Sequence, residues 1–329
     1  MKVLVVGYGS IGKRHIKNLS KLTKTQVIVL THRKLDNFLK KNKCQVFSDI
    51  HECINLKPDF AIIANSTELH IPTAIILAKH GIHLFIEKPL SNNLKNLKIL
   101  NNLVSQKKLI TLLGSNLRFH PCIKKIKYLL ESNKIGIPIS AYVENSSYLP
   151  LWHKNRDYRI EYAANELKSG GIIFTNIHEL DYLCWFFGIP KSIFSLTEKL
   201  SNLELDSSDI SNMIIKFGNN LTASLHLDFF QKSPFRCCKI VGTKGILYWN
   251  DQKNILNFFD NTKSAWSKLM TLKQFNLNQT YEDELSYFIS CIKKNQQCDN
   301  NLNKSIQILK IASYAKNSSK LKKMVKTNV

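Results

Sequence analysis

A glycine-rich hexapeptide near the start of the chain has the residue types and spacing of a phosphate-binding turn. Gly7-Tyr8-Gly9-Ser10-Ile11-Gly12 follows a short apolar run and precedes a stretch with helical spacing. In a G-x-G-x-x-G motif the first glycine permits a tight turn, the second lets the backbone approach a pyrophosphate, and the third allows close helix–strand packing. The helix N-terminus then offers free N–H groups to the phosphates. The motif predicts a dinucleotide site that includes Gly7, Gly9, Ser10, Ile11 and Gly12.

The residues after the second apolar run bear on which dinucleotide binds. Sites that take NAD usually hold an acidic side chain there, which binds the ribose hydroxyls. Here the sequence is Leu30-Thr31-His32-Arg33-Lys34, which contains no acid. His32 or Arg33 could instead face the 2′-phosphate of NADP, so the sequence favours NADP over NAD. The alternative is a basic loop in solvent, because basic residues are common throughout the chain.

The elements that must position these residues alternate between strand and helix over the first 120 residues. Short β-branched runs are typical of buried parallel strands, and the stretches between them have helical spacing. The alternation predicts an α/β fold with a doubly wound, parallel Rossmann sheet. The predicted strands are Val3–Val6, Gln26–Leu30, Gln45–Phe47, Phe60–Ala64, Ile82–Ile86 and Leu109–Leu113, and the predicted helices are Ile11–Leu22, Leu35–Lys43, Pro72–His80 and Leu94–Ser105.

The pattern changes at about residue 120, and several strand-like runs then follow one another with short turns between them. We therefore predict two domains, a dinucleotide-binding domain over residues 1–120 and a substrate-binding, oligomerising domain over residues 121–329. The second domain is expected to be α+β, with an open and largely antiparallel sheet. Its predicted strands are Ile139–Asn145, Asn212–Phe217, Thr222–Asp228, Cys237–Val241, Ile246–Trp249 and Ile255–Phe259, and its predicted helices are Cys122–Asn133, Tyr281–Lys294 and Asn303–Lys316.

The composition excludes several classes of protein. The chain has 329 residues, of which 44% are hydrophobic and 22% charged, as is typical of globular proteins. No apolar run approaches the ~20 residues that a membrane span needs, and the N-terminus lacks a signal-peptide pattern, so we expect a cytoplasmic protein without membrane contact. The eight cysteines form no C-x-x-C pair and no zinc-like cluster, which predicts reduced, mostly buried thiols and no metal site.

The net charge of +23 has two interpretations. It could mark an anionic partner such as nucleic acid, or it could be compositional bias. The lysines are scattered, and no helix-turn-helix, RNP or zinc motif accompanies them, so we favour bias, with an allowance for an anionic substrate and no specific nucleic-acid partner. The densest basic run, residues 320–326, is expected to be a frayed helix end.

A series of short motifs runs through the chain after the glycine loop. Glu87-Lys88-Pro89 follows an apolar strand, Asn116-Leu117-Arg118-Phe119-His120-Pro121 follows the last predicted Rossmann strand, and Ile135-Gly136 comes next. Gly170-Gly171 precedes His178-Glu179-Leu180-Asp181, and Val241-Gly242-Thr243-Lys244-Gly245 lies among the later strands. In order and spacing these motifs resemble the Gfo/Idh/MocA superfamily of sugar and polyol oxidoreductases, which includes glucose–fructose oxidoreductase and inositol 2-dehydrogenase.

The resemblance implies roles for two residues in particular. It places Lys88 between the nicotinamide and the substrate hydroxyl, where a lysine can stabilise developing negative charge. It makes His178 the acid–base residue, because imidazole suits proton transfer near neutral pH. It also implies a cis peptide before Pro89. The further residues expected around the cofactor are Asn65, Ser66, His70 and Glu87.

Other residues are candidates for binding substrate. The loop that contains Tyr158 and Arg159 resembles one branch of the superfamily, linked to bacterial surface sugars, and could cap a sugar ring and bind an anion. Arg118 and His120 could act similarly. For these residues a contact at a domain interface is an equal alternative. Asp181 is expected either to be a surface acid or to orient a neighbouring group.

The chain departs from the family pattern at one position. Many relatives carry an aspartate three or four residues before the histidine, where this chain has Phe174 and Thr175. We expect an NAD(P)-dependent oxidoreductase that transfers a hydride to or from a secondary hydroxyl or ketone of a sugar, nucleotide sugar or cyclitol, with Thr175 in the substrate site. The alternative is a dinucleotide-binding relative without catalysis, a sensor or a structural protein. Family members commonly form homodimers or homotetramers through the open face of the second sheet.

Overall fold

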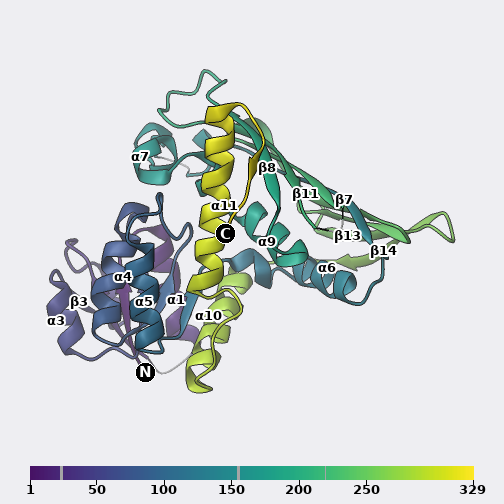
Figure 1. The fold of residues 1–329 in the computed structure, drawn as a ribbon. Helices are drawn as coiled ribbons and strands as arrows, with labels where there is room; N and C mark the ends of the chain where they lie inside the picture. Colours follow the sequence, from purple (N-terminus) through teal and green to yellow (C-terminus); the bar gives the residue numbers. More distant parts are fainter. Residues whose placement is uncertain (23–24, 154–155, 219) are drawn as a thin grey trace. The chain divides into compact units, whose positions relative to one another are not determined.

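Six parallel strands form the sheet of the N-terminal part of the chain (Figure 1). The computed structural model describes residues 1–22, 25–153, 156–218 and 220–329. The strand order is β3-β2-β1-β4-β5-β6, and every neighbouring pair is parallel. The order reverses between β1 and β4, and ligands of doubly wound sheets bind at the carboxyl ends of strands at such a point. The strands are β1 (Lys2–Val6), β2 (Gln26–Leu30), β3 (Gln45–Phe47), β4 (Phe60–Ile63), β5 (His83–Ile86) and β6 (Thr111–Leu113).

Local sequence explains why these strands and their helices form. The four apolar residues of β1 are buried, as a strand covered on both faces requires. The Asp36 and Asp49 carboxylates accept the Leu39 and His51 amides and so cap the N-termini of α2 and α3. The expected Rossmann sheet is confirmed. Its helices are α1 (Ser10–Leu22), α2 (Asn37–Lys41), α3 (Ile50–Asn55), α4 (His70–Lys79) and α5 (Leu97–Gln106).

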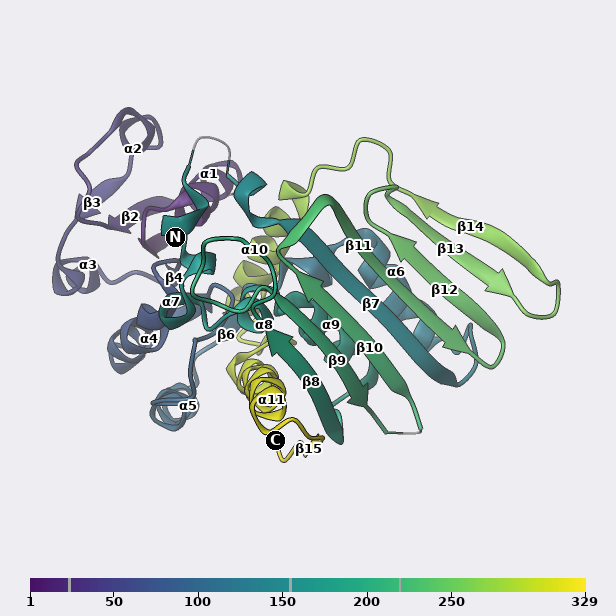
Figure 2. The same cartoon turned by 90° about the horizontal axis from the view of Figure 1, so that it is seen from above.

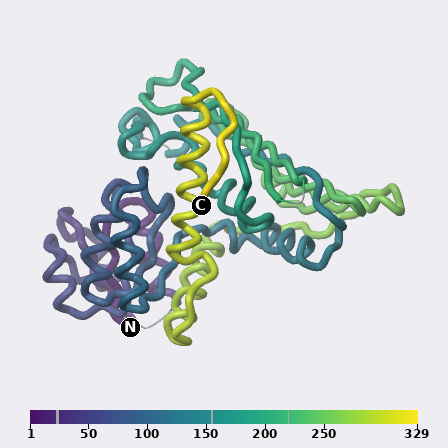
Figure 3. Tube along the Cα trace, viewed as in Figure 1, coloured from purple at the N-terminus to yellow at the C-terminus, as the bar shows by residue number. Residues whose placement is uncertain are grey.

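A later helix completes this part of the molecule. Residues 278–306, which include α10 (Asn278–Lys293), belong to the same compact unit as residues 1–116, and the trace in Figure 3 shows these late residues in yellow-green. Phe288 of α10 packs edge-to-face on Phe60 and Phe85, with ring centroids 5.3 and 5.7 Å apart. The division expected at residue 120 assigned α10 to the second domain. The apolar face of α10 is readable in the sequence, but which sheet it covers is not.

We call residues 1–116 and 278–306 the Rossmann unit, and residues 117–277 and 307–329 the C-terminal unit. The C-terminal unit is built on a nine-stranded sheet of order β14-β13-β12-β11-β7-β10-β9-β8-β15 (Figure 2). Only the β10–β7 pair is parallel among its described strands, so the largely antiparallel sheet is confirmed. The strands are β7 (Pro138–Tyr148), β8 (Ser192–Glu198), β9 (Ile210–Lys216), β10 (Thr222–Asp228), β11 (Phe230–Gly242), β12 (Gly245–Asn250), β13 (Ile255–Asp260), β14 (Ala265–Thr271) and β15 (Val325–Lys326).

Side chains of this sheet alternate between a buried and an open face, as the period of a strand dictates. In β10 Ala223, Leu225 and Leu227 are buried, whereas Thr222, Ser224 and His226 are partly exposed. Helices α8 and α9 contact strands of the sheet, and α6 contacts α9. The helices of the unit are α6 (Pro121–Glu131), α7 (Glu166–Ser169), α8 (Ile172–Thr175), α9 (His178–Phe187) and α11 (Leu302–Leu321), whose first residues, up to Ile306, lie in the Rossmann unit.

The C-terminal tail differs from its expected conformation. The basic run at residues 320–326 is not a frayed helix end, because α11 ends at Leu321 and Val325–Lys326 form β15. Val325 and Lys326 pair with Ile193 and Ser192 of β8. The edge of a sheet offers unpaired N–H and C=O groups, and the tail satisfies some of them. Such pairing depends on a distant strand and leaves no local signal in the tail.

Other observations concern the whole chain. No helix of the described ranges is long and apolar enough to cross a membrane. All eight cysteines are free thiols, and all but Cys44 are buried. The Lys88–Pro89 peptide is cis, as the resemblance implies.

Candidate functional site

The glycine turn after β1 is fixed by contacts that leave no room for side chains. Gly7 has φ +100°, and a Cβ there would lie 2.6 Å from the Ala64 carbonyl oxygen. A Cβ on Gly12 would lie 2.2 Å from the Gly7 carbonyl oxygen. Gly9 differs, because no described atom lies within 4 Å of the place its Cβ would take. Gly7 and Gly12 are therefore required by the fold, whereas Gly9 leaves space that a ligand can approach.

Helix α1 begins inside this turn and presents its N-terminal amides there. Its first i→i−4 hydrogen bond runs from the Lys13 N–H to the Gly9 carbonyl. The amides of Ser10, Ile11 and Gly12 precede that bond, and an α-helix leaves such amides without acceptors of its own. Free amides together with the positive end of the helix dipole form an anion site.

An acidic residue that the sequence analysis missed lies against the same turn. The Tyr8 hydroxyl donates to the two carboxylate oxygens of Asp36 at 2.7 and 2.8 Å, and the Lys13 ammonium lies 3.7 Å from that carboxylate. The Leu39 N–H, and after it the Tyr8 hydroxyl, lower the pKa of Asp36. The sequence does contain a signal for Asp36, because aspartate is a preferred residue type at a helix N-cap. Asp36 lies beyond Lys34, six residues after the end of β2.

The basic residues at the end of β2 are open to solvent. The side chains of His32 and Arg33 are exposed, and the Arg33 amide donates to the Thr31 hydroxyl at 3.2 Å. They follow β2, whose carboxyl end lies at the same edge of the sheet as the glycine turn because the two strands are parallel. The Asp36 carboxylate accepts hydrogen bonds from Tyr8 and Leu39, and its side chain is still 44% exposed, so the loop presents an acid beside the basic residues.

The predicted residues after β4 and β5 are tied to one another. Buried His70 directs Nδ1 to the Pro89 carbonyl at 2.9 Å and Nε2 to the Asn65 carbonyl at 3.2 Å. Asn65 donates its side-chain amide to Thr73, while its Oδ1 is buried and without a hydrogen-bond partner among the described residues. Ser66 follows Asn65 and immediately precedes a turn of 3-10 helix. His70 therefore joins the two loops, and Asn65 keeps one acceptor available.

Glu87 and Lys88 occupy the carboxyl end of β5. Glu87 is buried and its amide donates to the Ile63 carbonyl of β4 at 2.9 Å, while Lys88 is half-buried. The His15 ring nitrogen Nε2 lies 2.6 Å from Glu87 Oε1. The sequence analysis did not select His15, since a lone histidine on the apolar face of a helix carries no signal of its own. The Rossmann unit thus brings the glycine turn and its His15 together with the residues that follow β4 and β5.

In the C-terminal unit, Thr175 and His178 lie at a junction of two helices. Thr175 is the last residue of α8 and His178 the first of α9, and both are buried. Glu179, the next residue, lies 2.9 Å from Arg236 of β11 and accepts from the Asn145 side chain of β7 at 3.3 Å. Two strands therefore hold the first turn of α9, and with it the position of His178.

Arg118 and Asp181 form a buried pair with two hydrogen bonds. Arg118 Nε donates to Asp181 Oδ2 at 2.8 Å and Nη2 donates to Oδ1 at 2.7 Å, and the guanidinium lies 5.4 Å from the centre of the Trp185 ring. Asp181 is thus not a surface acid and orients a neighbour, which is the second of its two expected roles. A bidentate pair of this kind fixes the guanidinium plane. Substrate binding by Arg118 stays a prediction.

His120 is enclosed within the C-terminal unit. Its Nδ1 accepts the Cys122 N–H at 3.2 Å and so caps α6, and its ring packs against Trp249 and Phe275. Burial, and next the nearby Arg236 charge, lower the pKa of His120 to about 4. At neutral pH this imidazole is therefore uncharged. Its proposed contact with substrate stays a prediction.

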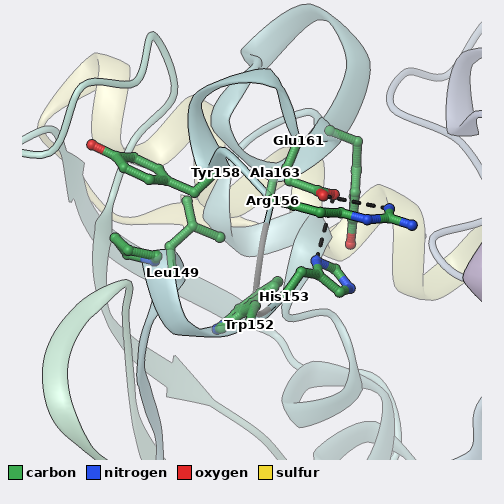
Figure 4. A pocket seen from close by; sticks show the side chains of 9 residues that line it. Leu149, Trp152, His153, Arg156, Tyr158, Glu161 and Ala163 are labelled. Carbon is green, nitrogen blue, oxygen red and sulfur yellow. Dashed lines mark ion pairs between the residues drawn. The ribbon is translucent and has the colours of Figure 1, made fainter.

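Tyr158 and Arg159 lie in a loop whose charges are paired. Arg159 donates to Asp157 at 2.7 Å and to Glu204 at 3.3 Å. Tyr158 lines the cavity drawn in Figure 4, whose volume of about 10 Å³ suits roughly one water molecule. In it Glu161 lies 3.5 Å from His153 and 3.6 Å from Arg156, the two ion pairs that Figure 4 marks. An anionic substrate at this loop would compete with carboxylates already in place.

Comparison with family models gives two matches. Residues 1–115 match the Gfo/Idh/MocA model, described as an oxidoreductase family with an NAD-binding Rossmann fold. Residues 123–248 match the C-terminal domain model of the same family.

Known proteins of similar sequence include several dehydrogenases, and also 2,7-anhydro-N-acetylneuraminate hydratases. A myo-inositol 2-dehydrogenase of Thermotoga maritima is 24% identical over 309 residues, which cover 90% of this chain and 89% of that protein. A UDP-N-acetylglucosamine 3-dehydrogenase of Acidithiobacillus ferrooxidans is 20% identical over 264 residues, 80% of this chain and 75% of that protein. The solved structure of a levoglucosan dehydrogenase with NADH and levoglucosan has a TM-score of 0.89 at 16% identity, covers 100% of both chains, and shows the same fold.

The residues of the glycine turn fit a nicotinamide dinucleotide. The open space beside Gly9, the N-terminal amides of α1 and the unpaired Oδ1 of Asn65 supply a close approach, an anion site and one acceptor. The cofactor-binding roles of the individual residues stay predictions.

Two glycine variants separate binding from folding. We expect Gly9→Ala to keep the melting temperature of the wild type while weakening NAD(P)H binding at least about tenfold, because its Cβ occupies space needed only by the ligand. Gly12→Ala is the comparison, and we expect it to lower the melting temperature, because its Cβ meets the Gly7 carbonyl. Fluorescence titration and calorimetry measure the two effects. Unchanged cofactor binding by Gly9→Ala would contradict the assignment.

Proposed function

Because the chain belongs to the Gfo/Idh/MocA family of NAD-binding oxidoreductases, as its motifs indicate, we propose that it oxidises a secondary hydroxyl of a sugar, nucleotide sugar or cyclitol, or reduces the corresponding ketone. The observation that carries the proposal is the position of Lys88. It follows β5 at the carboxyl edge of the sheet, and buried hydrogen bonds join its loop to the loop after β4. The inositol and UDP-N-acetylglucosamine dehydrogenases among the relatives support this substrate class.

Lys88 acts on the reacting oxygen in this proposal. The nicotinamide, when bound, supplies the acceptor or donor of the hydride. The Lys88 ammonium donates a hydrogen bond to the substrate oxygen and stabilises the negative charge that develops there during hydride transfer. Its half-buried side chain raises the strength of that interaction above its value in water. Asn65 lies at the same edge of the sheet, where its buried Oδ1 can accept a hydrogen bond from a donor group of the ligand and orient it.

His178 moves the proton in this proposal. Loss of a hydride from a secondary alcohol leaves a proton on oxygen, and a histidine can accept it near neutral pH. The contacts of Glu179 with β7 and β11 hold the first turn of α9, so the imidazole is presented from a rigid element. Thr175 has a hydroxyl where many relatives have a carboxylate, so the proposed mechanism uses a lysine and a histidine with a neutral third residue.

Replacement of Lys88 tests the proposal. We expect Lys88→Ala to lower kcat at least about 100-fold, because it removes the donor to the developing charge, with NAD(P)H affinity changed less than about threefold. The assay follows nicotinamide absorbance with a panel that contains myo-inositol, UDP-N-acetylglucosamine and levoglucosan. Lys95→Ala, an exposed lysine of the following loop, is the matched control and should keep full activity.

Two outcomes would oppose this function. Turnover retained by Lys88→Ala would exclude the role of the lysine. Tight cofactor binding by the wild type without turnover of any panel member would favour the non-catalytic alternative that Thr175 motivates.

For the cofactor, we propose NADP in preference to NAD. The exposed His32 and Arg33 follow β2, and the nearest acid, Asp36, is held by Tyr8 and Leu39. A guanidinium is well suited to a phosphate, with which it forms paired charge-assisted hydrogen bonds.

The preference is tested at Arg33. We expect Arg33→Ala to weaken NADPH binding about tenfold or more and to leave NADH binding unchanged, because only NADPH has the 2′-phosphate. Lys41→Ala, an exposed basic residue of α2, controls for the loss of one positive charge nearby. Fluorescence titrations with both nucleotides give the ratio, and tighter binding of NADH to the wild type would contradict the preference.

We also propose that the chain forms homodimers or homotetramers through the open face of the C-terminal sheet. Apolar side chains on that face are exposed, among them Tyr142, Ile214 and Trp266 at 40, 41 and 54%. Tyr142 and Ile214 alternate with buried residues of their own strands, so the sheet itself directs them outward, and Trp266 is paired with Phe259 of β13. Exposed apolar surface of this kind is typical of interfaces.

Self-association is measured by analytical ultracentrifugation. We expect Ile214→Lys to raise the dissociation constant about 30-fold or more, because it places a charge in the buried part of the interface. Leu167→Lys, on an exposed leucine of α7, is the control. A monomeric wild type at micromolar concentration would overturn the proposal.

A further inference from the structure

A buried histidine links the glycine-turn helix to the proposed catalytic loop. His15 lies in α1, three residues after Gly12, and its side chain is 0% exposed. Its Nε2 lies 2.6 Å from Oε1 of Glu87, whose side chain is 9% exposed. The His15 ring packs edge-on against Phe85 of β5, with centroids 5.1 Å apart. Neither side chain has a part in the proposed chemistry.

The contacts define which nitrogen carries the proton. His15 Nδ1 is buried and has no hydrogen-bond partner among the described residues. A proton on Nδ1 would be a buried donor without an acceptor, which is costly, whereas a proton on Nε2 accounts for the short contact with the carboxylate. His15 therefore donates from Nε2 to Glu87.

The second oxygen of Glu87 contacts Lys88. Glu87 Oε2 accepts the backbone N–H of Lys88 at 3.2 Å. Gly114 leaves the room that this orientation needs, because a Cβ there would lie 3.0 Å from Oε2. Tyr281 of α10 packs against His15 at 6.5 Å, and burial, with a further contribution from the Glu87 charge, raises the pKa of Tyr281 to about 12. The carboxylate is thus held on one side by His15 and fixes the Lys88 backbone on the other.

We propose that His15 is a positioning residue for Lys88. The His15–Glu87–Lys88 chain of hydrogen bonds sets the direction in which the lysine leaves the backbone. It also joins two elements into one rigid arrangement. One is the helix whose N-terminus faces the cofactor phosphates, and the other is the loop that carries the lysine. The expected effect on kcat rests on the proposed function, whereas the expected effect on the Lys88 amide does not.

A purely structural role would have a different signature. If His15 only filled the core, His15→Leu and His15→Gln would both act by changing the free energy of unfolding. If it positions Glu87 by donating a hydrogen bond, glutamine retains function, because its side-chain amide can donate as Nε2 does, and leucine does not.

The first test needs neither substrate nor cofactor. Hydrogen–deuterium exchange, with fragmentation that isolates the Lys88 amide, is measured on the full-length wild type, His15→Leu and His15→Gln. We expect exchange at Lys88 about tenfold faster in His15→Leu, because Glu87 no longer holds the amide, and close to wild type in His15→Gln. Equal exchange at Lys88 in all three proteins would overturn the inference.

The second test is kinetic. We expect His15→Leu to lower kcat about 10- to 100-fold with KM and NAD(P)H affinity changed less than about threefold, since a small misplacement of a catalytic group has an effect of this size. His15→Gln should restore kcat to within about threefold of the wild type. A fall in kcat that is the same in both variants would assign His15 a structural role only.

The matched control is His83, at the other end of β5. Its Nδ1 accepts the Ile110 N–H at 3.0 Å, so His83→Leu also removes a histidine hydrogen bond from the same sheet. We expect it to lower the melting temperature and to leave kcat and the Lys88 amide unchanged. If His15→Leu does not fold, Glu87→Ala replaces it, because alanine removes both acceptor oxygens, and unaltered Lys88 exchange in that variant would overturn the inference.

The two proposals fail separately. If Lys88→Ala retains turnover, the proposed mechanism is wrong, and the exchange experiment still tests the hydrogen-bond chain. If Lys88→Ala is inactive and His15→Leu has the kcat of the wild type, only the inference about His15 is wrong.

Discussion

The close approach of the first glycine turn to its neighbours is the constraint on which the Rossmann unit depends. Gly7 lies against the peptide that follows β4, and Gly12 lies against the carbonyl of Gly7. These two contacts determine where α1 begins and how near it lies to the sheet. The amides at its N-terminus and the burial of His15 one turn later both follow from that placement. One steric requirement therefore positions the candidate anion site and the residue that contacts Glu87.

Several arginines of this chain are paired with carboxylates, although the net charge is +23. Arg118 binds Asp181 inside the C-terminal unit, and Arg236 binds Glu179. At the surface, Arg159 binds Asp157 and Glu204. The Arg236–Glu179 pair fixes α9 to β11, and the Arg118–Asp181 pair fixes α9 to the 3-10 turn before α6. Removing one partner would leave the other charged and buried, which is strongly destabilising. These arginines thus orient structure. The exposed basic residues next to the glycine turn include Arg14 of α1 as well as His32 and Arg33 after β2.

The departure from the expected pattern at Thr175 falls at the junction of α8 and α9. Thr175 ends α8, and the next helix begins at His178 with its first turn held by Glu179 to β7 and β11. The histidine is therefore positioned by a carboxylate one residue later and not by a carboxylate before it. This arrangement supports proton transfer by His178 with a neutral residue at position 175, as the proposed function requires.

The sequence by itself determined the local parts of this protein. The glycine spacing, the β-branched runs and the alternating strands follow from short-range sterics and periodicity, so the Rossmann sheet and the second sheet could be predicted from them. The family was indicated by the resemblance of its short motifs, in their order along the chain. Tertiary structure alone decided which distant residues meet. It placed α10 on the first sheet, paired Val325 with β8, and brought Asp36 to Tyr8 and His15 to Glu87. The spacing of residues in the sequence does not predict such contacts. They depend on how whole helices and strands pack, and on which buried polar groups then form hydrogen bonds with one another.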